Sequence, residues 1–361
     1  MALPHLSDAA SLASFDDAPQ HGPRPLPLFL DLLRSETATS AERRTAALRG
    51  LAAYQSAPRP PARAEHPVLA QAGRARLLDL GGAGPALLLV PSLINPPHIL
   101  DLAEGRSLAA WLATQGFRPL LLDWGTPTPE EAGLDIAGHI ETLLLPLIDA
   151  IGEPPLLLGY CLGGTMAMAA AMLRPVRGLA LVASPFHFNG FGDAARADIA
   201  ALWQAARPPA ETMGLVPMEV LQSGFWRLDP ARTIGKYEDF GRLDPGSDQA
   251  QAFVALEDWA NDGAPLTLAA GRELMEDFVG RDTPGSGHWT VGGVRIDPTA
   301  LACPAIDIVS LSDRIVPAAS AAGLPDRIML GAGHVGMIVG GRARAQLWEP
   351  LAAWLSRAVV A

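Results

Sequence analysis

The chain has 361 residues, of which 49 % are hydrophobic, and this length suffices for one large domain with an insertion or for two ordinary domains. Acidic residues exceed basic ones by 11 and no Lys/Arg cluster occurs, which excludes a nucleic-acid or anionic-membrane surface because both need a basic footprint. The two cysteines, Cys161 and Cys303, are far apart and no signal peptide is recognisable, so we expect no disulfide framework and a reducing, cytoplasmic setting.

Residues 1–65 are the first predicted segment, an N-terminal helical leader rich in Ala, Pro and Arg. Helices are expected over residues 27–33 and 41–54, and the prolines within 58–61 end the segment as a linker. No chemistry follows from this composition.

From residue 75 onward strands alternate with helices, which predicts an α/β fold with a mostly parallel sheet. The core is expected in residues 66–186 and 299–361, interrupted over 187–298 by a helical insertion that holds four of the eight tryptophans and reads as a cap or lid. By their apolar runs and periodicity, we expect strands over 76–80, 85–91, 119–124, 156–158, 178–183, 305–310 and 327–330, and helices over 108–115, 134–151 and 343–358.

The apolar stretch 154–173 has about the length that spans a bilayer. Three glycines and two prolines fall within residues 154–164, and the three consecutive leucines there read as a buried parallel strand. We therefore expect no transmembrane segment.

The most informative motif is the run Gly159-Tyr160-Cys161-Leu162-Gly163, which follows that strand and precedes a helix of small residues. It has the form of the nucleophile elbow of an α/β-hydrolase, with a thiol in place of the usual hydroxyl. Gly159 and Gly163 leave room for the sharp turn, and the start of the helix favours a thiolate at Cys161. The motif indicates covalent acyl chemistry.

A thiol nucleophile needs a base, and the base needs an orienting carboxylate. In this fold the chain order is nucleophile, acid, base, and Asp313 and His334 each follow an apolar strand in that order. All three side chains should meet at the carboxyl edge of the sheet. Asp307, within a strand, and Asp326, beside a proline, are weaker candidates for the acid.

An oxyanion hole needs two N–H donors. We expect the first from Leu162, directly after the nucleophile, and the second from the loop that follows the strand over 85–91. Prolines in that loop have no N–H, which leaves Leu93 or Ile94, with Ile94 favoured by the alignment described next.

Other sites are not indicated by the sequence. The glycine pair after Cys161 lacks the pattern of a dinucleotide or phosphate loop. No metal-ligand spacing occurs, and Cys303, set before a proline and a strand, reads as inert packing.

Five segments in order resemble the polyhydroxyalkanoate synthase family. The run 159–165, Gly-Tyr-Cys-Leu-Gly-Gly-Thr, is similar to the family's lipase-like box, in which cysteine replaces serine. The other similar segments are a proline-rich oxyanion segment with the helix after it, the next block along the chain, and the acid and base blocks, at residues 90–108, 122–125, 313–317 and 333–336. The chain length resembles that of the family's shorter, two-subunit class.

This resemblance implies a polymerising acyltransferase. Cys161 would accept the acyl group of a (3R)-hydroxyacyl-coenzyme A, and His334 would deprotonate the thiol and then activate the substrate hydroxyl that extends the chain. Asp313 would orient His334. No cofactor is implied beyond the coenzyme A thioester as substrate; the partners would be a second copy or a second synthase subunit, and the location the surface of a polyester granule.

The chain departs from the family at two places. Arg314 stands where the family has histidine after the acid, and Asn95-Pro96-Pro97-His98 stands where it has Asn-Lys-Tyr-Tyr. A thioesterase or polyester hydrolase on the same scaffold is therefore the alternative function. A catalytically silent, granule-associated relative is a third, and the complete set of nucleophile, acid and base argues against it.

Overall fold

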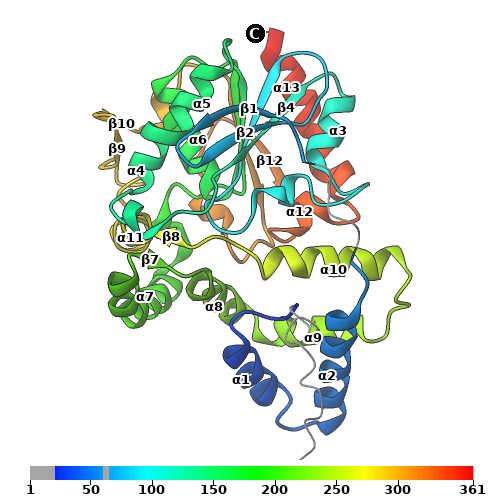
Figure 1. Ribbon diagram of the computed structural model, residues 1–361. Coiled ribbons are helices and arrows are strands. Elements are labelled where there is room, and N and C mark those ends of the chain that lie inside the picture. The colour runs from blue at the N-terminus through cyan, green and yellow to red at the C-terminus, as the bar shows by residue number, and fades with distance from the viewer. Residues whose placement is uncertain (1–20, 60–64, 361) are drawn as a thin grey trace, which may run out of the picture. The chain divides into compact units, whose positions relative to one another are not determined.

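The computed structural model describes residues 21–59 and 65–360. Within them the chain divides into two compact units, one built from the N-terminal helices together with residues 230–254 and the other from the rest. The larger unit contains a sheet with helices on both faces (Figure 1).

The sheet has eight strands in the order β1-β2-β4-β3-β5-β6-β11-β12. From β4 to β12 all neighbours are parallel, whereas β1 and β2 are antiparallel to each other and β2 is antiparallel to β4. The strands are β1 (Val68–Ala72), β2 (Ala75–Asp79), β3 (Ala86–Val90), β4 (Arg118–Asp123), β5 (Leu156–Tyr160), β6 (Gly178–Val182), β11 (Ala305–Ser310) and β12 (Asp326–Leu330). This architecture confirms the predicted α/β-hydrolase fold.

The central strands are buried on both faces, which explains their nearly continuous apolar sequences. In β3, for example, Leu88 and Val90 join one hydrophobic cluster while Leu87 and Leu89 join the other. This follows from the alternation of side chains along a strand.

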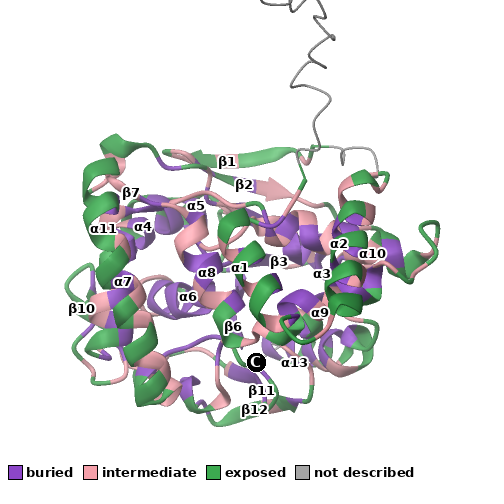
Figure 2. Ribbon diagram, turned by 90° about the horizontal axis from the view of Figure 1, so that it is seen from below, coloured by how far each residue is buried: buried purple, intermediate pink, exposed green. Residues whose placement is uncertain are grey.

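Two groups of helices cover the sheet (Figure 1). On one face lie α6 (Leu162–Leu173) and a continuous helical segment formed by α4 (Ile136–His139), the π-helical turn η4 (Ile140–Leu144) and α5 (Leu145–Ala150). On the other face lie α3 (Leu108–Thr114), α12 (Gly336–Val339), η9 (Arg344–Trp348) and α13 (Glu349–Val360). Figure 2 shows the buried position of α6 and the exposed edge strand β1.

Strand β1 was not predicted from the sequence. Its residues, Val-Leu-Ala-Gln-Ala, are mostly exposed or half-buried at the edge of the sheet. An edge strand of this kind carries no buried alternation to signal it. The short strands β7 (Leu215–Val216), β8 (Leu266–Thr267), β9 (Thr290–Val291) and β10 (Val294–Arg295) were also not predicted, because two residues give no period.

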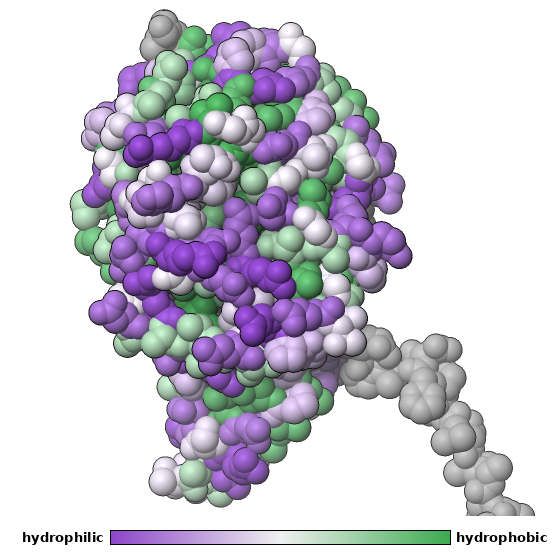
Figure 3. All heavy atoms as spheres, turned by 90° about the vertical axis from the view of Figure 1, so that its left-hand side faces the viewer, coloured by the Kyte–Doolittle hydropathy of each residue, from purple (hydrophilic) through white to green (hydrophobic). Residues whose placement is uncertain are grey.

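The region after β6 is helical, as expected. Its elements in the larger unit are η5 (Phe188–Phe191), α7 (Asp193–Met213), α8 (Met218–Leu228), the end of α10 (Asp248–Ala260), α11 (Leu268–Arg272) and η6 (Glu273–Gly280). Figure 3 shows hydrophilic side chains spread over the face that is on the left in Figure 1, with smaller apolar areas between them. No helix in residues 21–59 and 65–360 is long and apolar enough to cross a bilayer.

The smaller unit joins α1 (Leu26–Glu36) and α2 (Ala41–Ser56) to α9 (Pro230–Phe240) and the start of α10. The rings of Phe29 and Tyr54 lie edge-on to Tyr237, at centroid distances of 5.2 and 6.0 Å. Gly50 lets α2 approach α9, because a Cβ there would clash with the Tyr237 carbonyl. The leader helices thus share a unit with residues 230–254, which were predicted to belong to the cap. The division into leader, core and cap stays a prediction.

Candidate active site

The turn between β5 and α6 is strained at one residue. Cys161 has φ +57° and ψ −134°, a conformation that residues other than glycine rarely adopt. Its N–H donates to the Val182 carbonyl at 3.0 Å, and its carbonyl accepts the Gly164 N–H at 2.9 Å. A tight strand-to-helix turn held in this way is the geometry of a nucleophile elbow.

The glycines of the elbow are required by close contacts. A Cβ on Gly159 would clash with the backbone of Gly164, and a Cβ on Gly163 would clash with the Val90 and Pro91 carbonyls. A Cβ on Gly164 itself would occupy the space of a serine side chain from the loop after β6. Side chains are therefore excluded around Cys161.

The predicted acid and base lie together on the loops after β11 and β12. Nδ1 of His334 is 2.6 Å from Oδ2 of Asp313. The other oxygen, Oδ1 of Asp313, accepts the N–H groups of Ile315 at 2.8 Å and Val316 at 3.0 Å. Both carboxylate oxygens are thus fixed, and the carboxylate side chain is fully buried.

A serine that no sequence motif indicates joins these two loops. The Ser310 hydroxyl, at the end of β11, donates to the Ala332 carbonyl, and its oxygen accepts the Ser312 N–H at 3.2 Å. Its signal in the sequence would have been a polar residue at the end of an apolar strand, where the side chain can satisfy a neighbouring loop.

The charges of the site stabilise a protonated imidazole. Burial by itself lowers the pKa of His334, but the negative charges of Cys161 and Asp313 and hydrogen bonds to both outweigh burial and raise that pKa to about 10. Because Nδ1 faces Asp313, the other ring nitrogen is left for the thiol. Asp313 and Cys161 therefore both act on the His334 imidazole, and the catalytic roles of these three residues stay a prediction.

The proposed oxyanion donors have different surroundings. Leu162 begins α6, and among the hydrogen bonds of the described residues none uses its N–H. The Ile94 N–H donates to the Ser92 hydroxyl oxygen at 3.0 Å, whereas no bond within the described part of the chain uses the Leu93 N–H. Leu93 and Leu162 belong to one hydrophobic cluster, and Ile94 packs against it.

The end of α10 and the residues just after it are hydrogen-bonded to the loop that carries Leu93 and Ile94. Trp259 Nε1 donates to the Pro96 carbonyl at 2.9 Å. Asn95, whose φ is +65°, donates from Nδ2 to the carbonyls of Ala260 at 3.4 Å and Asp262 at 3.3 Å. We call these three hydrogen bonds the α10 latch.

The acid and the base are buried, whereas Cys161 is half-buried. His334 is 8 % exposed and Asp313 is 7 % exposed. Trp259 belongs to the same hydrophobic cluster as Tyr160, and Cys161 packs against that cluster. Charges among buried apolar side chains interact more strongly than in water.

The weaker acid candidates have other partners. Asp307 accepts the Leu324 N–H at 2.8 Å, and burial raises the pKa of its carboxyl. Asp326 accepts a hydrogen bond from Trp354 Nε1 at 3.1 Å. Arg314, the departure beside the acid, forms an exposed ion pair with Asp229 at 2.8 Å.

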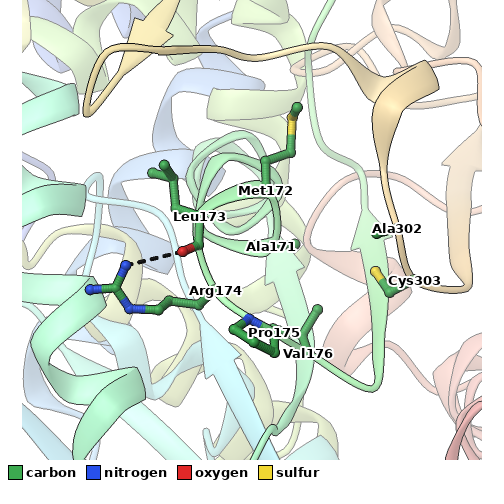
Figure 4. Close-up of a pocket in the computed structure, with 8 residues that line it drawn as sticks. All are labelled: Ala171, Met172, Leu173, Arg174, Pro175, Val176, Ala302 and Cys303. Atoms are coloured by element: carbon green, nitrogen blue, oxygen red, sulfur yellow. Dashed lines mark hydrogen bonds between the residues drawn. The ribbon is translucent and has the colours of Figure 1, made fainter.

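Cys303 lies at the opposite edge of the sheet. It precedes β11, whereas Cys161 follows β5, and these strands belong to the parallel part of the sheet. Figure 4 shows Cys303 and Ala302 across a pocket of about 420 Å³ from the last turn of α6 and the loop after it. Burial raises the pKa of the Cys303 thiol, which makes it a suitable control for Cys161.

No group of three or more His, Cys, Asp or Glu side chains in the described ranges is arranged to hold a metal ion.

Comparisons with known proteins support the fold and identify similar chains. The model of the alpha/beta hydrolase family matches residues 87–345. A poly(3-hydroxyalkanoate) polymerase subunit PhaC from Haloferax mediterranei is 28 % identical over 75 % of this chain and 58 % of its own length. One from Allochromatium vinosum is 29 % identical over 75 % of this chain and 80 % of its own. The expected resemblance to polyhydroxyalkanoate synthases is therefore confirmed, although the chain spans little more than half of the first relative.

Among solved structures, BpoC from Mycobacterium tuberculosis is similar, with a TM-score of 0.50 and 16 % identity. The match covers 82 % of this chain and 99 % of that one. This likeness supports the fold alone.

Proposed function

Because this chain belongs to the alpha/beta hydrolase family, we propose that it is an acyltransferase that polymerises (3R)-hydroxyacyl-coenzyme A through an acyl group bound to Cys161. The observation that carries the proposal is a cysteine at a strained elbow beside a buried His334–Asp313 pair. The polymerase names of the relatives supply the substrate class.

In the first half-reaction the Cys161 sulfur attacks the thioester carbonyl of the substrate while His334 holds the thiol proton. The oxyanion that forms accepts the Leu162 N–H and a second N–H from Leu93 or Ile94. When the intermediate collapses, the carbon–sulfur bond to coenzyme A breaks, and His334 returns the proton to the departing thiolate. The acyl group is then a thioester of Cys161.

In the second half-reaction the hydroxyl of another hydroxyacyl group attacks this thioester. His334 removes the hydroxyl proton, an ester bond forms and the Cys161 sulfur leaves. A thiolate is a good leaving group, so the enzyme thioester stays reactive toward an alcohol. The apolar side chains beside Cys161, Trp259 at the end of α10 among them, favour the alcohol over water.

Hydrolysis is the alternative, supported by the prolines that replace the family's residues beside the oxyanion loop. The direct test supplies purified protein with 3-hydroxybutyryl-coenzyme A and measures released coenzyme A together with the product. Polymer supports the proposal, whereas stoichiometric coenzyme A with only monomeric hydroxy acid would assign the chain to thioesterases. If the protein releases no coenzyme A, forms no product and carries no acyl group on Cys161, it is a catalytically silent relative.

Two single-cysteine variants control this experiment. Cys161→Ala should abolish coenzyme A release, and Cys303→Ala should leave it within about twofold, since Cys303 lies at the other edge of the sheet. Intact-mass measurement should find the acyl adduct in the second variant and not in the first.

We further propose that the chain works at the surface of its polyester product, as a homodimer or with a second synthase subunit. Sedimentation of the protein with the polymer, and its molar mass in solution before and after substrate addition, test this proposal.

A further inference from the structure

The residue before the nucleophile touches the base. Tyr160 is the last residue of β5 and is 3 % exposed. Its ring stacks on the His334 imidazole with centroids 5.0 Å apart and planes inclined by 26°. Its hydroxyl donates to the His334 backbone carbonyl at 3.3 Å.

These two contacts restrain different parts of His334. The hydroxyl holds the backbone of the loop after β12, and the ring covers one face of the imidazole, which limits rotation of that ring. Asp313 fixes only the Nδ1 side. With Tyr160 against its face, the imidazole keeps its remaining nitrogen directed to the thiol.

The anchor itself is rigid. Strand β5 pairs with β3 on one side and with β6 on the other, so Tyr160 moves with the centre of the sheet. Cys161 is the next residue in the chain. One strand end therefore sets the position of the nucleophile directly and the position of the base through an aromatic ring.

The charges of the site favour the stacking of the Tyr160 ring on the His334 imidazole. The face of an aromatic ring attracts a cation, by about 0.5 to 2 kcal/mol in favourable sites, and His334 is the protonated partner here. Burial, with the negative charges of Cys161 and Asp313, raises the pKa of Tyr160 well above its usual value. Tyr160 thus stays a neutral ring and hydrogen-bond donor in every state of the site.

We propose that Tyr160 is a positioning residue that holds His334, through ring stacking and a hydroxyl–carbonyl bond, in the orientation that directs its second ring nitrogen to Cys161. This inference rests on the proposed function only in taking Cys161 as the nucleophile. It does not depend on which acyl group is transferred or on the acceptor.

The test is the pH dependence of Cys161 alkylation by iodoacetamide, in a Cys303→Ser background with a single thiol. The upper inflection of the rate should lie near pH 10, where His334 loses its proton. Tyr160→Leu should lower the rate at pH 7 about three- to tenfold and move that inflection down by about half to one pH unit, from the lost cation–ring attraction. Tyr160→Phe keeps the ring and should stay within about threefold, with the inflection unmoved.

Leu158→Val is the control for a general loss of packing, because Leu158 is buried on the same strand and in the same cluster. It should change thermal stability without moving the inflection. The inference is overturned if folded Tyr160→Leu keeps the wild-type rate and inflection, or if its loss equals that of Leu158→Val. Iodoacetamide needs neither coenzyme A nor an acceptor, so failure to make polymer leaves this result standing. Alkylation of Cys161 no faster than that of Cys303 in the wild-type chain would instead refute the nucleophile itself.

Discussion

Asp313→Asn removes one charge from the site with little change of shape. An asparagine side-chain oxygen can still accept the N–H groups of Ile315 and Val316, which lie 2.8 and 3.0 Å from Oδ1. On the side that faces His334, however, a neutral amide replaces the carboxylate oxygen that lies 2.6 Å from Nδ1. The change therefore tests the charge and the hydrogen bond of the acid and little else.

The magnitude follows from the kind of hydrogen bond that is lost. A bond to a charged group is worth about 1.5 to 3 kcal/mol, and one pKa unit corresponds to about 1.4 kcal/mol. The pKa of His334, about 10 in the wild type, should fall by about 1 to 2 units in Asp313→Asn. An asparagine amide can donate to Nδ1 of His334, which leaves the proton of the neutral ring on the other nitrogen, facing the thiol. That nitrogen then cannot accept the thiol proton, so acyl transfer should fall on the order of 10²- to 10⁴-fold.

Two assays check this expectation. The alkylation rate of Cys161 against pH gives the inflection, and coenzyme A release from 3-hydroxybutyryl-coenzyme A gives the turnover. The reasoning is refuted if Asp313→Asn keeps its inflection near pH 10, or if its turnover stays within threefold of the wild type. Asp326→Asn is the matched control, since Asp326 bonds to Trp354 and not to the base.

Three further predictions concern the elbow, the α10 latch and the buried carboxyl of Glu273. Gly163→Ala should destabilise the fold by at least about 2 kcal/mol and slow Cys161 alkylation, because its Cβ meets two backbone carbonyls. Gly133→Ala is the control, since open space surrounds that position, and it should change neither the thermal unfolding temperature nor the alkylation rate. Trp259→Phe removes one bond of the α10 latch and should raise the share of monomeric hydroxy acid in the product; an unchanged product ratio would contradict a water-excluding role for α10. Burial raises the pKa of Glu273 to about 7, above its unfolded value, so its stabilising contribution is complete below about pH 4.5 and is lost as pH rises through 7. Urea unfolding of the wild type and of Glu273→Gln at pH 5 and pH 8 should therefore show a larger fall in unfolding free energy for the wild type. Equal falls in the two proteins would contradict this role of Glu273.

Much of the fold could be predicted because its signals are local. The buried strands are short apolar runs between turn residues, and their alternation with helices defines the parallel sheet. The exceptions have physical causes: β1 is an exposed edge strand, and the association of α2 with α9 joins residues nearly 200 positions apart. No local periodicity carries that second kind of information.

The sequence by itself determined the elbow around Cys161 and the order of nucleophile, acid and base, because close backbone packing admits only glycine and parallel strands end at one edge. Only the tertiary structure decided what fixes these groups in place. The Tyr160 ring on His334, the serine between the two loops and the α10 latch are contacts between distant segments. Their geometry depends on how strands and helices pack, since a polar or aromatic residue at a strand end is compatible with many partners until folding selects one.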